Sequence, residues 1–199
     1  MPRSKKVEGR GPRVEGKKRR RPSGLRPSTL DLRLRRVRLL LCDVDGVLTD
    51  GSIFINQDSE TKQFSIQDGL GLRLLQRSGV KVGWVSNRPS PVTARRAAEL
   101  KMDFLHQNDG NKVEAVEAIL KQAGFTWAET CFVGDDLVDL GALRRAGVAV
   151  AVANGIAEAK ARADYVTRAR GGHGAVREVV TLILKAQKKW SKLVRDYSA

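Results

Sequence analysis

The sequence predicts an α/β fold: a three-layer sandwich with a central parallel sheet of Rossmann-like type. From about residue 37, short apolar runs alternate with amphipathic segments long enough to form helices. Strands joined by helices form βαβ units, which place the strands parallel and the helices on both faces. In addition, polar and acidic residues directly follow several of the apolar runs, as they do at the carboxyl edge of a parallel sheet.

The apolar runs have the composition of strands buried on both faces, and Gly, Pro or Asp residues bound several of them. Between them, residues 112–123 place Val113, Val116 and Ile119 at helical spacing, and Gly124 follows as a stop signal. The predicted strands are residues 37–42, 80–85, 102–105, 130–133, 148–152 and 165–167. The predicted helices are residues 69–77, 89–100, 112–123, 137–146 and 175–193.

Residues 52–67 contain a predicted β-hairpin whose arms are residues 53–55 and 63–66. It is an insertion between the first strand and the first helix. Its apolar residues fall on both faces, where a monomer has little to cover them. The hairpin therefore indicates an oligomer; the alternative is that it packs against its own domain. The apolar residues are Ile53, Phe54, Ile55, Phe64 and Ile66.

The formal net charge is +15, and the first 38 residues hold 15 of the 37 Lys and Arg but only 3 of the 22 Asp and Glu. We therefore assign residues 1–36 to a basic tail, predicted to be disordered, and residues 37–199 to the folded domain. The Lys17–Pro22 run could contact nucleic acid or an acidic surface. A solvated extension is the favoured interpretation, because low-complexity charge runs are usually solvated. No aromatic residues interleave the run, so a base-stacking surface is unsupported.

The composition also bears on location. No apolar run is long enough to span a membrane, and no apolar segment typical of a signal peptide follows the basic start. Cys42 and Cys131 lie inside predicted strands and read as small buried hydrophobic residues, so no disulfide framework is expected. We expect a cytoplasmic protein without membrane partners.

Two aspartates, Asp43 and Asp45, follow the first predicted strand, with Gly46 after them. Carboxylates this close repel one another, and a bound Mg²⁺ removes the repulsion because hard cations prefer oxygen ligands. One carboxylate can then serve as a nucleophile and the other as an acid and base. The alternative is a simple turn, because Asp-Gly is also a turn signal.

Further polar residues follow other predicted strands: Ser86 with Asn87 and Arg88, and Asp135 with Asp136. Lys112 opens a predicted helix. Strand ends of one sheet converge on one crevice, so these groups favour phosphoryl transfer, in which positioning and charge neutralisation dominate. Taken singly, Ser86 could be a turn hydroxyl, Lys112 a solvated lysine and the aspartates helix caps.

In this order the residues resemble a known family. Residues 43–51 resemble the first motif of the haloacid dehalogenase superfamily, and Ser86, Lys112 and residues 134–136 match its second to fourth motifs. Within the superfamily the chain is most similar to the cap-less 3-deoxy-D-manno-octulosonate 8-phosphate phosphatases. The segments that carry this closer resemblance, which extends over residues 38–185, are residues 48–51, 68–71, 107–112 and 171–178.

The resemblance implies a fold with a β-hairpin in place of a cap, and a role for each motif residue. Asp43 is the implied nucleophile and Asp45 the acid and base. Asp43, Asp45 (through its carbonyl) and Asp135 are the implied Mg²⁺ ligands. Asp136 assists the metal ligands or orients Lys112, and Asp139 is a further candidate for this surrounding role. The implied substrate-binding residues are Ser86, Asn87, Arg88, Lys112 and Arg177, with His173 as a further candidate.

The implied activity is Mg²⁺-dependent hydrolysis of 3-deoxy-D-manno-octulosonate 8-phosphate, a sugar-acid phosphate of lipopolysaccharide precursor synthesis, through an aspartyl-phosphate. Relatives are homotetramers whose hairpins form a barrel over neighbouring sites. Asn87 stands where the family usually has glycine, which bears on the choice of sugar. The alternatives are another sugar, nucleotide or sialic-acid-type phosphate as substrate, a non-catalytic oligomerisation module, or a nucleic-acid binder using the tail.

Overall fold

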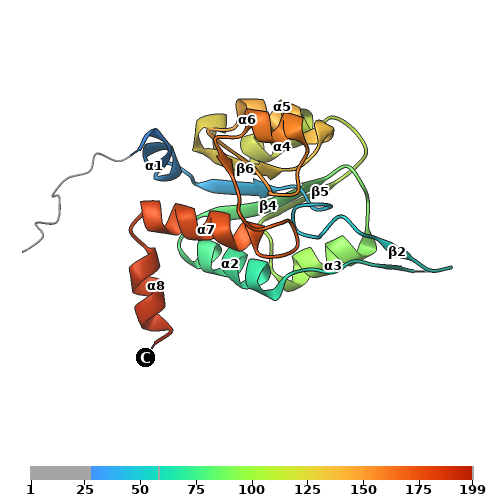
Figure 1. Ribbon diagram of the computed structural model, residues 1–199, viewed down its shortest axis with the longest axis horizontal. Helices are drawn as coiled ribbons and strands as arrows, with labels where there is room; N and C mark the ends of the chain where they lie inside the picture. The colour runs from blue at the N-terminus through green and yellow to red at the C-terminus, as the bar shows by residue number, and fades with distance from the viewer. Residues whose placement is uncertain (1–27, 58, 199) are drawn as a thin grey trace, which may run out of the picture.

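The structure is a computed structural model that describes residues 28–57 and 59–198, and its centre is a six-stranded parallel sheet (Figure 1). The strand order is β5-β4-β1-β6-β7-β8, with β1 in the interior. Every pairing in this sheet is parallel, which confirms the predicted fold class. The strands are β1 (Leu39–Cys42), β4 (Lys81–Ser86), β5 (Phe104–Gln107), β6 (Thr130–Gly134), β7 (Val148–Ala151) and β8 (Tyr165–Val166).

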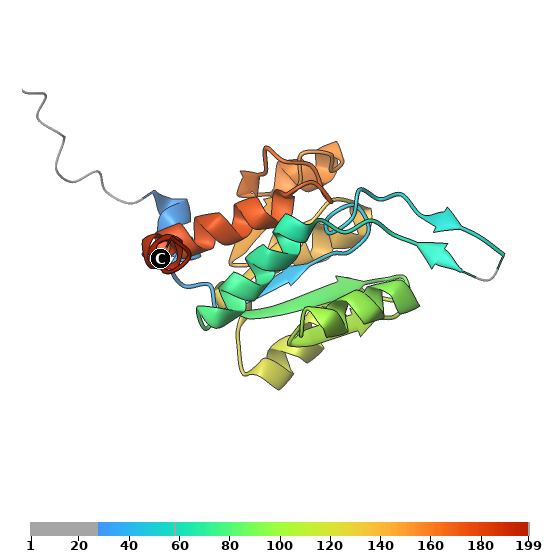
Figure 2. The same ribbon diagram turned by 90° about the horizontal axis from the view of Figure 1, so that it is seen from below.

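Helices cover both faces of the sheet, as the connections predict (Figures 1 and 2). Side chains of β1 alternate between two apolar layers: Leu40 faces α2 and α7, whereas Leu41 faces α4 and α5. The first layer comprises α2 (Ile66–Arg77), α3 (Pro91–Glu99) and α7 (Ala175–Ala186). The second comprises α4 (Lys112–Ala123), α5 (Leu140–Arg145) and α6 (Ala157–Arg162). This burial on both faces fixes the carboxyl ends of the strands, where the candidate site lies.

The hairpin projects from the domain as a two-stranded ribbon of β2 (Phe54–Ile55) and β3 (Glu60–Thr61) (Figure 2). The predicted second arm, residues 63–66, is wrong. Ser65 caps α2 by accepting a hydrogen bond from the Asp68 N–H, so Ile66 begins the helix. Phe64 stacks on Trp84 with its ring centroid 5.9 Å away, so it belongs to the core.

The helix predicted over residues 175–193 is two helices, α7 and α8 (Trp190–Asp196). Lys188 between them has a φ of 59°, a left-handed conformation that ends α7. In addition, α6 was not predicted.

The described chain begins with α1 (Thr29–Leu34), which lies ahead of residue 37, where the sequence analysis starts the domain. Ser28 and Asp31 form its capping box, and Leu34 is buried in the core. The Lys17–Pro22 run lies outside the described residues. Among the helices that the structure describes, none is long and apolar enough to cross a membrane.

Candidate active site

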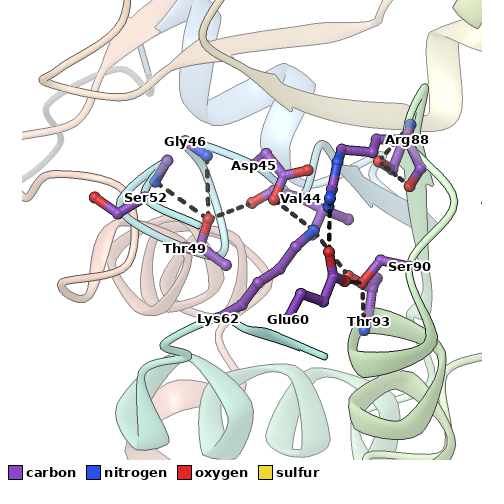
Figure 3. Close-up of polar contacts among 12 residues, drawn as sticks. Val44, Asp45, Gly46, Thr49, Ser52, Glu60, Lys62, Arg88, Ser90 and Thr93 are labelled. Carbon is purple, nitrogen blue, oxygen red and sulfur yellow. Dashed lines mark hydrogen bonds and ion pairs between the residues drawn. The ribbon is translucent and has the colours of Figure 1, made fainter. Parts of the chain in front are cut away.

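The chain leaves β1 through a tight loop that carries Asp43 and Asp45. The Asp43 N–H donates to the Val133 carbonyl and so continues the β1–β6 ladder by one residue. Beyond it the chain turns back at Gly46, whose φ of 95° favours glycine. The Thr49 hydroxyl accepts hydrogen bonds from the Gly46 N–H at 3.3 Å and closes the loop (Figure 3).

Three carboxylates meet at the ends of β1 and β6. Asp43, Asp135 and Asp139 each offer one oxygen within 4.8 Å of the others. Burial, followed by the charge of Asp139, raises the pKa of Asp43 well above its ordinary value, although Lys112 opposes the shift. The same two causes raise the pKa of Asp135 to about 6. The cluster is therefore a site of unfavourable negative charge, which a cation would stabilise.

Lys112 supplies one positive charge to this cluster from the first residue of α4. Its Nζ lies 2.6 Å from Asp43 Oδ1 and 2.7 Å from Asp139 Oδ1. Burial opposes the charge of this buried ammonium, but the two carboxylates outweigh it and raise the pKa of Lys112. The Asn111 side chain caps α4 and so fixes the start of the helix.

Asp139 shapes the loop after β6. Its Oδ1 contacts Lys112, and its Oδ2 accepts hydrogen bonds from the N–H groups of Asp135 (2.9 Å) and Asp136 (3.2 Å). By contrast, Asp136 caps the 3₁₀-helix η2 (Leu137–Asp139) by accepting from the Leu137 N–H. Of the two carboxylates predicted to surround the metal ligands, it is Asp139 and not Asp136 that orients Lys112.

The residues at the ends of β1 and β6 fit a hard divalent cation. Asp135 Oδ1 is buried and has no hydrogen-bond partner among the described residues. A Cβ at Gly46 would lie 2.1 Å from Asp135 Oδ2, so only glycine lets the two loops approach this closely. Carboxylate oxygens are the ligands that Mg²⁺ prefers. Because both oxygens of Asp139 are engaged, Asp43 and Asp135 are the side chains with oxygens left for a metal.

The last residue of β4 and the two residues after it are held by local contacts. The Ser86 hydroxyl accepts a hydrogen bond from the Arg88 N–H at 3.1 Å, the turn contact weighed as its alternative. The Asn87 side-chain amide donates to the Gly110 carbonyl, and Arg88 pairs with Glu60 at 2.6 Å. Because β4 is the neighbour of β1 in the sheet, these three residues lie at the same edge as the carboxylates.

The structure does not bring Arg177 to the carboxylate cluster. Its guanidinium lies over the Trp190 ring, 5.4 Å from the centroid, and its backbone N–H donates to Asp68. His173 lies in the glycine-rich segment just before α7. Among the described residues of a single chain, neither side chain forms a hydrogen bond or ion pair with Asp43 or Asp135.

Two residues that hold the loop after β1 were not predicted from the sequence. Asn154 donates from its side-chain amide to the Gly46 carbonyl at 3.2 Å and accepts from the Gly171 N–H at 2.6 Å. It follows β7, so the strand-end rule could have found it. Lys62 forms an ion pair with Asp45 at 2.7 Å. Lys62 lies in a predicted hairpin and not at the end of a sheet strand, so the sequence pattern did not indicate a role in the site.

The fold and the carboxylate–lysine cluster together define a phosphoryl-transfer enzyme built on a parallel α/β sheet. A family model described as haloacid dehalogenase-like hydrolase matches residues 97–179. The 3-deoxy-D-manno-octulosonate 8-phosphate phosphatase of Escherichia coli K12 is 41% identical over 154 residues, which are 77% of this chain and 82% of that protein.

Solved structures of similar proteins support the same family assignment. The phosphatase of the same name from Moraxella catarrhalis has a TM-score of 0.82 and 39% identity, covering 84% of this chain and 97% of that one. The cobalt-bound phosphatase from Haemophilus influenzae has a TM-score of 0.78 and 38% identity, covering 80% and 94%. The chain belongs to the 3-deoxy-D-manno-octulosonate 8-phosphate phosphatase family of the haloacid dehalogenase-like hydrolases.

Proposed function

We propose that the chain hydrolyses 3-deoxy-D-manno-octulosonate 8-phosphate to 3-deoxy-D-manno-octulosonate and phosphate in a Mg²⁺-dependent reaction. The observation that carries the proposal is the cluster of buried Asp43 and Lys112 with partly buried Asp135 at the carboxyl edge of the sheet. The Moraxella catarrhalis relative was crystallised with a magnesium ion, a phosphate ion and the sugar product. The reaction yields a precursor for lipopolysaccharide synthesis.

In the proposed mechanism, Asp43 attacks the phosphorus. Lys112, paired with Asp43 Oδ1 at 2.6 Å, holds the attacking carboxylate in place. The bond between phosphorus and the sugar oxygen breaks, and Asp45 gives that oxygen a proton. Asp45 then takes a proton from the water that attacks the aspartyl-phosphate, which releases phosphate and restores Asp43.

Charge neutralisation makes this attack feasible, because a phosphate dianion is repelled by carboxylates. Asp43, Asp135 and the Asp45 carbonyl would hold Mg²⁺, which would supply that neutralisation. Lys112 and the Ser86 hydroxyl are the proposed contacts of the phosphoryl oxygens. Asn87, Arg88 and Arg177 are the proposed contacts of the sugar; Arg177 would meet it in an assembled oligomer.

The direct test is phosphate release from this ester with and without Mg²⁺, beside a panel of other sugar and sialic-acid-type phosphates. We expect Mg²⁺-dependent turnover that is strongest for the octulosonate ester. Equal turnover across the panel would retain the chemistry and remove the substrate assignment. A folded, Mg²⁺-loaded protein that turns over none of the esters would contradict the proposal and favour a non-catalytic oligomerisation module.

The proposed assembly is a homotetramer formed through the 52–67 hairpin. Phe54 and Ile55 in the projecting ribbon are 63% and 75% exposed, which favours a partner surface. A two-stranded ribbon is also marginal alone. We expect sedimentation of the wild-type protein at four times the chain mass, and a smaller species for Ile55→Lys. A wild-type monomer would contradict this assembly.

The cytoplasmic location and the lack of nucleic-acid and membrane partners remain predictions. The location agrees with Cys42 and Cys131, which are buried and free. A nucleic-acid binder using the tail would show binding that weakens steeply with salt.

A further inference from the structure

We infer that Lys62 is the positioning residue for the acid and base Asp45. The inference rests on the proposed function, in which Asp45 protonates the leaving sugar oxygen. Lys62 comes directly after β3, so it belongs to the base of the hairpin and not to a strand end of the sheet.

The contacts of Lys62 are those of a buried ion pair. Its side chain is 0% exposed, whereas that of Asp45 is 24% exposed. Its Nζ lies 2.7 Å from Asp45 Oδ1 and 3.3 Å from the Thr93 hydroxyl (Figure 3). A buried ammonium is stable only beside a compensating charge and hydrogen-bond acceptors. Lys62 therefore holds one oxygen of Asp45 in a fixed place.

A second set of contacts holds the segment of the hairpin that carries Lys62. Two residues earlier, Glu60 pairs with Arg88 at 2.6 Å and accepts a hydrogen bond from the Ser90 hydroxyl. The Ser90 hydroxyl in turn accepts from the Thr93 N–H and caps α3. Figure 3 shows the Glu60 carboxylate pointing toward Ser90 at this helix start, whereas Lys62 extends toward Asp45. The base of the hairpin is thus fastened to α3, and Lys62 extends this attachment to the loop after β1.

The geometry has a chemical consequence for the leaving group. Lys62 engages Oδ1 of Asp45, so Oδ2 is the oxygen that can face the reacting ester. Without Lys62 the carboxyl group is free to rotate, and proton delivery to the sugar oxygen loses its alignment. Small losses of alignment have large effects on rate. A leaving group that departs as a stable anion needs no such proton, so its reaction tolerates the change.

The test compares two esters in a Lys62→Met variant, which keeps the length of the side chain and removes its charge. We expect kcat/KM for the octulosonate ester to fall by about 10- to 100-fold. We expect kcat/KM for p-nitrophenyl phosphate to stay within about threefold, because its leaving group needs no proton. Equal losses on both esters, or no loss on either, would overturn the inference.

Lys81→Met is the matched control. It removes a lysine from an exposed ion pair with Asp103 and is expected to leave both esters unchanged. Thr93→Val provides a second variant, which retains Lys62 and removes its other polar contact. We expect a smaller fall in kcat/KM, again confined to the octulosonate ester. If Thr93→Val has the same activity as the wild type on both esters, the result would count against the inference. This outcome remains decisive even where Lys62→Met fails to fold.

The failure of the inference and that of the proposed function are distinguishable. A wild-type protein that hydrolyses neither ester refutes the proposed function. A wild-type protein that hydrolyses both, with a Lys62→Met variant that loses both equally, refutes only the positioning role. Addition of methylammonium to a Lys62→Ala variant should restore part of the activity on the octulosonate ester, and an unchanged rate would speak against the role.

Discussion

The Asp43→Asn variant is expected to lose phosphate release by about 10⁴-fold or more, because an amide cannot attack phosphorus. The substitution keeps the shape of the side chain. Burial and Asp139 already disfavour the charge of Asp43, so its removal relieves repulsion in the cluster. Lys112 retains its ion pair with Asp139. We therefore expect a folded protein with an unchanged or higher melting temperature.

The measurements are kcat for phosphate release and the melting temperature of the same preparation. Asp164→Asn serves as the control: it is a partly buried aspartate, paired with Arg33 outside the site. Its activity should equal that of the wild type. An Asp43→Asn protein that keeps more than about a tenth of the activity would mean that another residue is the nucleophile.

The second large effect is expected for Asp135→Asn, which should weaken Mg²⁺ binding by about 100-fold or more. Its Oδ1 is buried without a hydrogen-bond partner among the described residues, so the carboxylate is unfavourable without a cation. We expect the melting temperature without Mg²⁺ to rise in the variant, and the increase that Mg²⁺ gives the wild type to disappear. Calorimetric Mg²⁺ titration and thermal unfolding measure the two effects.

The stability of the metal-free protein should change with pH in a definite direction. The pKa of Asp135 is about 6 in the folded chain, above its ordinary value of 3.8. Ionised Asp135 therefore lowers the stability of the metal-free protein. This loss of stability is complete above about pH 6 and absent below the ordinary pKa of 3.8. Asp135→Asn should remove this loss of stability with rising pH. Because Mg²⁺ binds the ionised form, wild-type affinity should fall as the pH drops through about 6. Identical profiles for wild type and variant would contradict this assignment.

Much of the site follows from one rule of topology. The carboxyl ends of parallel strands share an edge, so Asp43, Ser86 and Asp135 were predicted to converge, and the structure places them at that edge. Lys112 was predicted at the start of a helix and stands there. These residues are close to a strand or helix end in the sequence, where the local pattern determines where they lie.

The remainder depends on contacts that no local pattern encodes. Asp139 reaches Lys112 because a 3₁₀-turn after β6 brings it back over the loop, whereas the helical pattern predicts a regular helix from residue 137. The alternation of residues 63–66 suggested a strand, but the cap at Ser65 and the packing of Phe64 decided otherwise. Such positions are set by tertiary packing, which overrides a short alternating pattern.

The central place of β1 has a consequence for how the chain folds. β1 is the first strand of the sheet in sequence, yet both of its neighbours, β4 and β6, come much later. Long loops must close before either pairing forms, and such non-local pairing is slow. During synthesis, Asp43 leaves the ribosome well before Asp135 and Lys112. The repelling carboxylates therefore meet only when most of the sheet has formed, so the chain can acquire its metal and activity only as a late event of folding.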